Sequence, residues 1–82
     1  MKSRSILPVE QQVTKIATAI KQRRKLLRIT QEDLAELSNI SKRYLYAIEK
    51  GTANPSIKTL LTLFEILGIQ MEVKIGPKHD RS

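Results

Sequence analysis

The chain has 82 residues, a net charge of +7 and no cysteine. This length allows a single domain over residues 1–82, and the lack of cysteine excludes disulfides and thiolate metal sites. No apolar run reaches the ~20 residues that a membrane span needs and the start lacks a signal-peptide core, so we expect a cytoplasmic protein with no membrane partner.

The first expected helix begins near Pro8, which suits a first helical position because its missing N–H has no partner there. Apolar residues then recur in steps of three and four, which predicts a helix to about Leu26. Residues 1–7 precede it as a basic arm. The excess charge lies in residues 1–30, which hold eight Lys or Arg against one acid. This bias suits binding to nucleic acid, although basic charge can also serve solubility alone.

Two short helices joined by a tight turn are expected over residues 30–51. Thr30 caps the first of them, and Asp33 follows three residues later. The turn at residues 38–40 contains Asn39, and Asn is the non-glycine residue best suited to a left-handed conformation. Ser41 caps the second helix, which ends at Gly51.

The starts of these two helices differ in charge. Two acids, Glu32 and Asp33, follow the first cap, as the partial positive charge of a helix N-terminus favours. Two cations, Lys42 and Arg43, follow the second cap, against the same rule. A local rule broken at one place indicates a functional demand there. A polyanion would meet that demand, and DNA is the leading candidate.

A fourth helix is expected to begin after Asn54 or Ser56 and to end at Gly68. It is apolar over more than one face, so the face that does not meet the core needs a second packing partner to bury it. Its main stripe is formed by Ile57, Leu60, Leu61, Phe64 and Leu67, with Leu63 and Ile66 beside it.

Residues 69–76 alternate apolar and polar side chains, which predicts a strand. The sequence holds no second convincing strand, and a lone strand leaves its backbone groups unpaired. Either residues 5–7 fold back beside it, or the same strand of a second copy pairs with it. We favour the second copy, because two-fold pairing also joins the spare faces of two fourth helices. We expect residues 77–82 to form a tail. The expected dimer interface comprises Leu63, Ile66, Met71, Val73 and Ile75.

The helix-turn-helix stretch resembles the XRE/Cro-type regulators, which include the repressors of lambdoid phages. The resemblance covers about residues 13–68 and implies an all-α, lambda-repressor-like bundle of four to five helices, to which the alternating pattern adds one C-terminal strand pairing across a dimer. Arg28 and Asn39 stand where the family usually has glycine; Asn39 is an easy substitute, whereas Arg28 would either strain the end of the first helix or shift its boundary. The matching motifs are Ile20-Lys21-x-x-Arg24, Ile29-Thr30-Gln31-Glu32-x-Leu34-Ala35, Ile40-Ser41, Ile48-Glu49-x-Gly51 and Asn54-Pro55-Ser56.

A narrower resemblance is to HipB-like antitoxins, whose fourth helix runs into one short strand that pairs across a dimer. It implies a dimeric autorepressor of a toxin–antitoxin operon, with a HipA-like Ser/Thr kinase as partner. Within the same class, the alternative is a free-standing phage-type repressor without a toxin. Outside that class, the alternative is a protein-interaction module on the same scaffold. The matching stretch is Thr59-Leu60-x-x-Leu63-Phe64-x-Ile66-Leu67, followed by Ile69-x-Met71-x-Val73.

The resemblance also implies roles for single residues, because the second helix of such a motif enters the major groove of DNA. Arg43 is expected to contact a guanine, and Lys42 either a base or a phosphate. Arg24 and Glu49 are expected to form a structural ion pair between the first and third helices. The expected base-contacting residues are Lys42, Arg43, Tyr46 and Ala47, and the expected phosphate-contacting residues are Gln31, Ser41, Tyr44, Lys50 and Thr52.

Several of these residues also fit a purely structural role. Gln31 is an ordinary residue for the start of a helix, Ser41 is first a helix cap, and the ring of Tyr44 could pack beside the turn. Catalysis is not expected, because the only histidine, His79, lies in the polar tail and there is no glycine-rich phosphate loop. We expect no metal and no cofactor.

Overall fold

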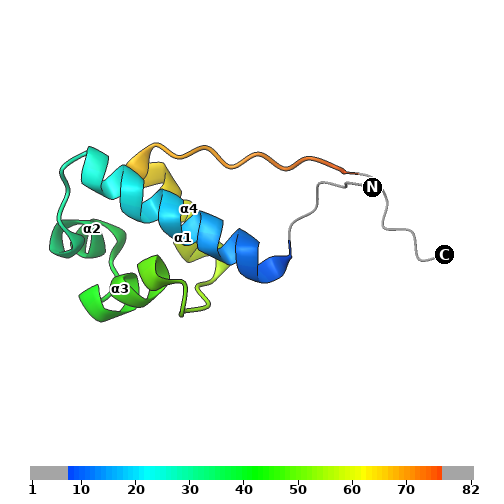
Figure 1. The fold of residues 1–82 in the computed structure, drawn as a ribbon. Coiled ribbons are helices and arrows are strands. Elements are labelled where there is room, and N and C mark those ends of the chain that lie inside the picture. Colours follow the sequence, from blue (N-terminus) through cyan, green and yellow to red (C-terminus); the bar gives the residue numbers. More distant parts are fainter. Residues whose placement is uncertain (1–7, 77–82) are drawn as a thin grey trace.

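The computed structural model describes residues 8–76, which form four α-helices (Figure 1). The helices are α1 (Val9–Leu26), α2 (Gln31–Ser38), α3 (Lys42–Lys50) and α4 (Ile57–Leu67). The predicted all-α bundle is confirmed. Four to five helices were predicted, and the described residues form four. The basic arm predicted for residues 1–7 and the tail predicted for residues 77–82 lie outside the described residues.

Side-chain caps fix where the last three helices begin. The hydroxyls of Thr30 and Ser41 each accept a hydrogen bond of 3.0 Å from the backbone N–H three residues later. For α4 the cap is Ser56, whose hydroxyl accepts from the N–H of Thr59 at 3.1 Å. Each such cap stabilises its helix by about 1 kcal/mol. Of the two residues predicted to cap α4, the structure therefore selects Ser56.

Residues in the left-handed conformation end the same three helices. The φ angle is 61° at Asn39, 78° at Gly51 and 72° at Gly68, as predicted for the turn and for the two glycine stops. After Gly68, the N–H of Ile69 donates to the carbonyl of Phe64 at 2.8 Å. The end at Asn39 sets the short connection between α2 and α3.

Arg28 is the other non-glycine residue with a positive φ in the described chain, at 60°. It lies in the connection from α1 to α2, where its N–H donates to the carbonyl of Lys25 at 3.0 Å. An L-residue with a long side chain loses roughly 1–2 kcal/mol in this conformation. The strain predicted at this departure from the family pattern is therefore present in the fold.

The hydrophobic core lies where the four helices meet. Figure 1 shows α1 crossing α4, with α2 and α3 packed beneath them at one end of the molecule. Helix α1 contacts α3 and α4, and α2 also contacts both. None of these helices in residues 8–76 is both long and apolar enough to span a bilayer. The fully buried side chains are Ile20, Leu34, Leu45, Leu63 and Leu67.

Helix α4 buries only part of the predicted main stripe, since Phe64 and Leu67 lie in the core together with Leu63 from beside that stripe. Leu63 is fully buried within the chain, whereas Ile57 and Leu61 are 72% and 44% exposed. Leu63 therefore packs in the core and cannot also contact a second copy, so its predicted place in a dimer interface is wrong. Ile66 is partly buried against the same core. Ile57 and Leu61, one helical turn apart, form what we call the α4 apolar surface.

Residues 69–76 leave α4 as an extended trace that runs past α1 (Figure 1), and they do not form a strand. A strand needs backbone hydrogen bonds to a neighbour, and no second strand lies beside this segment among residues 8–76. The predicted strand is thus absent from the single chain, while its pairing across a dimer stays a prediction. The side chains of Met71, Val73 and Ile75 are 48%, 82% and 94% exposed.

Candidate nucleic-acid interface

Helix α3 presents a polar, cationic face to solvent and an apolar face to the core. Arg43, Tyr46 and Lys50 are exposed, and their spacing of three and four residues places them on one side of the helix. Leu45 and Ile48 lie buried on the other side. The structure therefore gathers Arg43 and Tyr46 from the predicted base-contacting set, with half-buried Ala47 at the edge of the same face.

Lys50 lies over the ring of Tyr46, with its Nζ 5.7 Å from the ring centroid. Such a cation–π contact at an exposed site contributes about 0.5–1 kcal/mol. It holds the Lys50 side chain along the exposed face of α3, on the same side as Arg43. Lys50, predicted as a phosphate contact, is therefore placed where it extends the cationic face.

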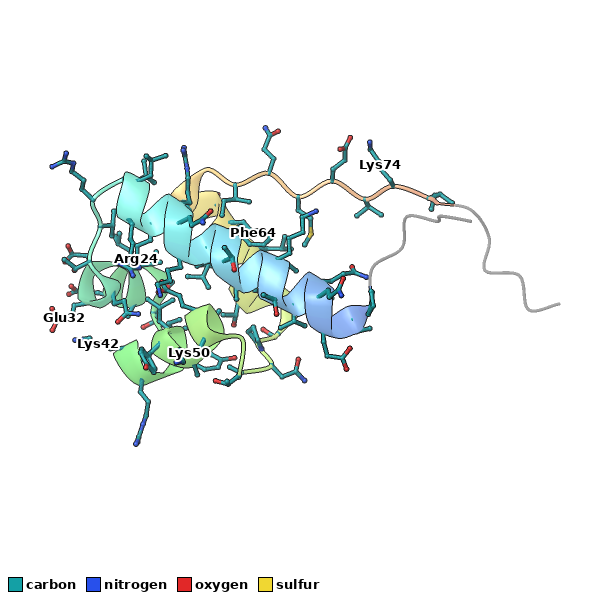
Figure 2. All side chains as sticks on the ribbon, in the orientation of Figure 1. Arg24, Glu32, Lys42, Lys50, Phe64 and Lys74 are labelled. Carbon is teal, nitrogen blue, oxygen red and sulfur yellow. The ribbon has the colours of Figure 1, made fainter. Side chains whose placement is uncertain are left out.

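Lys42 stands at the first position of α3, at the edge of this face. Its Nζ lies 3.4 Å from Oε2 of Glu32, which is in the first turn of α2. Figure 2 shows the two side chains meeting across the gap between the helices. The charge of Lys42 is thus balanced by an acid from the neighbouring helix. Arg43, the other cation at the start of α3, has no ion-pair partner among the described residues.

The start of α2 offers a second polar site beside α3. Within the described chain, no hydrogen bond uses the backbone N–H groups of Gln31 and Glu32, because the cap Thr30 serves only the two residues that follow them. Free N–H groups at a helix N-terminus attract anions such as phosphate. The side chain of Gln31 is half-buried, and its Nε2 donates to Oε1 of Glu49 at 3.0 Å.

Arg24 and Glu49 form the expected ion pair between α1 and α3, with Nε 2.7 Å from Oε2. Glu49 thereby accepts hydrogen bonds from two directions, from Arg24 on α1 and from Gln31 on α2. This arrangement fixes the start of α2 relative to α3, which carries the cationic face. The sequence indicated the pair but not the link to Gln31, since no spacing rule joins residues 31 and 49.

The remaining predicted phosphate contacts have structural partners of their own. The Ser41 hydroxyl is used as the cap of α3. Tyr44 is partly buried against the core, which matches its structural alternative. The hydroxyl of Thr52 donates to the carbonyl of Ala47 at 3.3 Å and is exposed, so it lies at the end of α3 within reach of a ligand on that face.

A comparison with protein-family models matches residues 20–74 to a helix-turn-helix family. The chain belongs to this helix-turn-helix family, of the XRE type. The matched range begins in the middle of α1 and includes all of α2, α3 and α4. The expected XRE/Cro-type membership is thereby confirmed, whereas the narrower resemblance to HipB-like antitoxins is not established by these matches.

Two curated relatives are named as a phage repressor and as a transcriptional regulator. The immunity repressor protein of Bacillus phage phi105 is 41% identical over 61 residues, which are 74% of this chain and 42% of that repressor. The chain thus spans less than half the length of the phage protein. An uncharacterized HTH-type transcriptional regulator of Methanocaldococcus jannaschii is 38% identical over 53 residues, covering 65% of this chain and 80% of that regulator.

Two solved structures of restriction–modification controller proteins share the fold. C.Esp1396I superposes with a TM-score of 0.67 at 31% identity, covering 78% of this chain and 82% of that chain. C.AhdI from Aeromonas hydrophila gives a TM-score of 0.68 at 28% identity, covering 73% of this chain and 91% of that chain. C.Esp1396I is also known as a tetramer in complex with its natural 35-base-pair operator, with a TM-score of 0.66 to this chain.

Proposed function

We propose that this protein binds double-stranded DNA sequence-specifically and represses transcription from the bound site. The observation that carries the proposal is the exposed face of α3, where Arg43, Tyr46 and Lys50 lie together beside the free N–H groups of α2. A helix fits the major groove of B-DNA, where side chains can tell base pairs apart. In this role α3 reads the bases, and Arg43 contacts a guanine through two hydrogen bonds.

The start of α2 anchors the protein on the DNA backbone in this proposal. The free N–H groups of Gln31 and Glu32 would donate to one phosphate, since such contacts position a protein without reading sequence. The Gln31 amide adds a further N–H beside them. Its bond to Glu49 supports this role by keeping the anchor at a constant distance from α3.

A dimer is the second part of the proposal. Operators of helix-turn-helix dimers have half-sites about 34 Å apart, which requires two copies of the reading helix. The α4 apolar surface supplies exposed leucine and isoleucine side chains for such a contact, and Met71, Val73 and Ile75 extend the apolar area along residues 69–76. Two-fold pairing of that segment would supply the strand partner that the single chain lacks.

Repression is supported by family membership and by the similarity to a phage immunity repressor. A repressor of this kind acts where the chromosome lies, so we place the protein in the cytoplasm and assign it no catalytic role. The relatives named above are a phage repressor, a transcription regulator and restriction–modification controllers. They favour a free-standing regulator over an antitoxin.

The antitoxin role, with a HipA-like kinase as partner, is a second candidate. It is favoured by the exposed, alternating apolar side chains of residues 69–76, which match the ending of HipB-like proteins. A HipA-like kinase encoded beside this protein, and recovered with it as a stable complex, would support the antitoxin role. If no such kinase is encoded beside the gene, the free-standing regulator is the better-supported function.

DNA binding is tested by replacing both cations at the start of α3, Lys42→Ala with Arg43→Ala. Both side chains are exposed, so the fold should be unchanged, as circular dichroism would verify. We expect fluorescence anisotropy to give a large loss of binding to the DNA upstream of the gene, because one good base contact alone is worth about 1–3 kcal/mol.

The control removes two positive charges elsewhere, Lys15→Ala with Lys58→Ala, both exposed on other helices. This control should bind nearly as well as the wild type. Equal losses in the two double variants would mean that only net charge matters. Unchanged binding in the Lys42 and Arg43 variant would instead support the protein-interaction module and refute the assignment of α3 as the reading helix.

A further inference from the structure

We infer that residues 70–76 pair antiparallel with the same segment of a second copy in one register, in which Val73 lies on the two-fold axis and Glu72 lies opposite Lys74 of the second copy. The inference rests on the dimer of the proposed function. It deepens that proposal by naming the residues through which the chain recognises its own copy.

Residues 70–76 offer an unpaired backbone edge. The N–H of Ile69 donates to the carbonyl of Phe64 at 2.8 Å and so belongs to the end of α4. Beyond Ile69, no backbone group of residues 70–76 is hydrogen-bonded within the described chain. An extended segment of this kind is a template for pairing with another strand.

The side chains of this segment alternate between two chemically distinct sides. Figure 2 shows Lys74 pointing away from the helices, so Glu72 lies on the same polar side. Met71, Val73 and Ile75 form the opposite, apolar side, and the last two are largely exposed. Neither Glu72 nor Lys74 forms an ion pair among residues 8–76.

Two-fold symmetry limits the possible registers. Residues directly opposite one another in an antiparallel pair have their side chains on the same face. The two-fold axis of such a pair is perpendicular to the sheet, so each residue and its own copy also share a face. Both conditions hold only if one residue of the segment lies opposite itself. The apolar alternation fits every such register, so other features must choose between them.

The charges favour a centre at Val73. A centre at Glu72 would set two carboxylates opposite one another, and a centre at Lys74 two ammonium groups; like charges directly opposite are destabilising. With Val73 at the centre, Glu72 lies opposite Lys74 of the second copy, and symmetry forms this pair twice. Opposite charges that face each other across strands stabilise the pairing, and this register also pairs all of residues 70–76.

Centres at the neighbouring apolar residues fit less well. A centre at Met71 would extend the pairing to Gly68, which has a φ of 72° and ends α4, so it cannot enter a strand. A centre at Ile75 would extend it to Pro77, which has no N–H to donate to the ladder. Both centres also break the pairing of the opposite charges.

Helix α4 runs antiparallel to α1. At the end of α4, the carbonyl of Leu67 accepts a hydrogen bond of 2.8 Å from Nε of Arg23, near the end of α1. Near the start of α4, Leu60 lines a pocket together with Val13 from the first half of α1. The segment after α4 turns back and runs past α1 toward the start of that helix (Figure 1). It therefore returns along the length of α4.

The length of this return places the axis level with the α4 apolar surface. From Gly68 to Val73, five extended residues cover about 16 Å, and the length of α4 is also about 16 Å. Val73 thus comes roughly level with the start of α4, where Ile57 and Leu61 are exposed. One two-fold axis can therefore serve both contacts of the proposed dimer.

Cross-linking tests the register directly, because the chain has no cysteine of its own. In the proposed register, the Cα atoms of the two copies of residue 73 lie about 4.5–5.5 Å apart, which suits a disulfide. The full-length variant Val73→Cys is incubated in a glutathione redox buffer, at a concentration where sedimentation shows a dimer. The cross-linked dimer is then measured on a non-reducing gel.

The controls for cross-linking are Glu72→Cys and Lys74→Cys, measured at concentrations where each is dimeric. In the proposed register, the Cα atoms of either position lie about 8 Å from those of its own copy, beyond the usual reach of a disulfide. We expect Val73→Cys to cross-link at least about tenfold faster than either control.

Charge exchange tests the pairing of Glu72 with Lys74. Each single variant, Glu72→Lys or Lys74→Glu, sets like charges opposite one another, so the dissociation constant of its homodimer should rise about tenfold or more. A mixture of the two variants restores opposite charges in both pairs. Native mass spectrometry should therefore show more heterodimer than the statistical share. The matched control mixes Glu36→Lys with Lys15→Glu, which make the same charge changes at exposed positions on α2 and α1, and should give the statistical share.

Each contrary result decides a different point. Fastest cross-linking at residue 72 or 74 would overturn the register, and a heterodimer at only the statistical share would overturn the charge pairing. A wild-type dimer in which none of the three thiols cross-links would overturn the strand pairing and leave the α4 apolar surface as the interface. A wild type that sediments as a monomer would instead refute the proposed dimer, and DNA binding by α3 is tested separately through Lys42 and Arg43.

Discussion

Arg24 and Glu49 form a buried pair in which both carboxylate oxygens accept a hydrogen bond from the guanidinium. The Arg24 Nε lies 2.7 Å from Oε2 of Glu49, and a terminal nitrogen lies 3.1 Å from Oε1. The two side chains are 9% and 2% exposed. The other terminal nitrogen donates to the carbonyl of Ile29 at 3.0 Å. The pair thus connects α1, the start of α2 and α3 at one point.

Breaking this pair should be costly. Arg24→Met keeps most of the side-chain volume but leaves the carboxylate of Glu49 buried without its counter-charge. Removing one member of a buried pair destabilises a protein by about 3–5 kcal/mol. We therefore expect the midpoint of urea unfolding, followed by circular dichroism, to fall sharply for Arg24→Met.

The double variant Arg24→Met with Glu49→Leu is the informative control, because it replaces both charges by apolar groups. Such replacements are often neutral or stabilising, so we expect most of the lost stability to return. Glu32→Gln, which breaks the exposed pair, should change stability by less than about 1 kcal/mol. A double variant as unstable as the single one would mean that α1 and α3 need the charges themselves.

The strained backbone at Arg28 offers a stabilising substitution. Arg28→Gly should raise the free energy of unfolding by about 0.5–1 kcal/mol, because glycine adopts a φ of 60° without strain but has more freedom to lose on folding. The measurement is thermal or urea unfolding. Asn39→Gly is the matched comparison at a φ of 61°, where Asn already tolerates the conformation, so its gain should be smaller. A loss of stability at Arg28→Gly would contradict the strain.

The α4 apolar surface should determine self-association. Ile57→Lys with Leu61→Lys places two charges where we expect a partner copy, while both positions are exposed in the single chain, so the fold should survive. Sedimentation velocity should then give a monomer, whereas the wild type should sediment as a dimer. Lys58→Ala with Glu65→Ala, exposed positions on the same helix, should remain dimeric.

We expect the C-terminal segment to make a separate contribution to the proposed dimer. Deleting residues 70–82 should weaken the association without unfolding the four helices, since Met71, Val73 and Ile75 are exposed and outside the core. A truncated protein that is as fully dimeric as the wild type would refute strand pairing between copies. It would leave the α4 apolar surface as the whole interface.

DNA binding should depend steeply on salt. Taking about two cationic phosphate contacts per protomer, a dimer makes about four, and the slope of log affinity against log salt is then about −3.6. Raising the salt fourfold would weaken binding by roughly two orders of magnitude. A titration by fluorescence anisotropy at several salt concentrations measures this slope. A slope near zero would contradict cationic contacts between α3 and DNA phosphates.

The local features of the fold followed from the sequence, because they depend on residues close together in the chain. Thr30 and Ser41 cap their helices, and Asn39, Gly51 and Gly68 end them, as the residue types predict. The family motif likewise placed Arg24 opposite Glu49. The caps and helix ends depend on residues within one helical turn, and the ion pair was indicated by the family motif. Neither prediction required knowledge of a tertiary contact.

The burial of α4 and the charges between helices needed the tertiary structure. A helix that is apolar over more than one face does not indicate which of those faces meets the core. The packing of α1 and α2 against α4 buried Leu63 and left Ile57 and Leu61 exposed. The pairing of Lys42 with Glu32, and of Gln31 with Glu49, depends on the angle between helices. The sequence alone determined where each helix begins and ends and which residue types crowd the start of α3. Only the fold decided which of those charges meet, because distances across helices are set by packing and not by spacing along the chain.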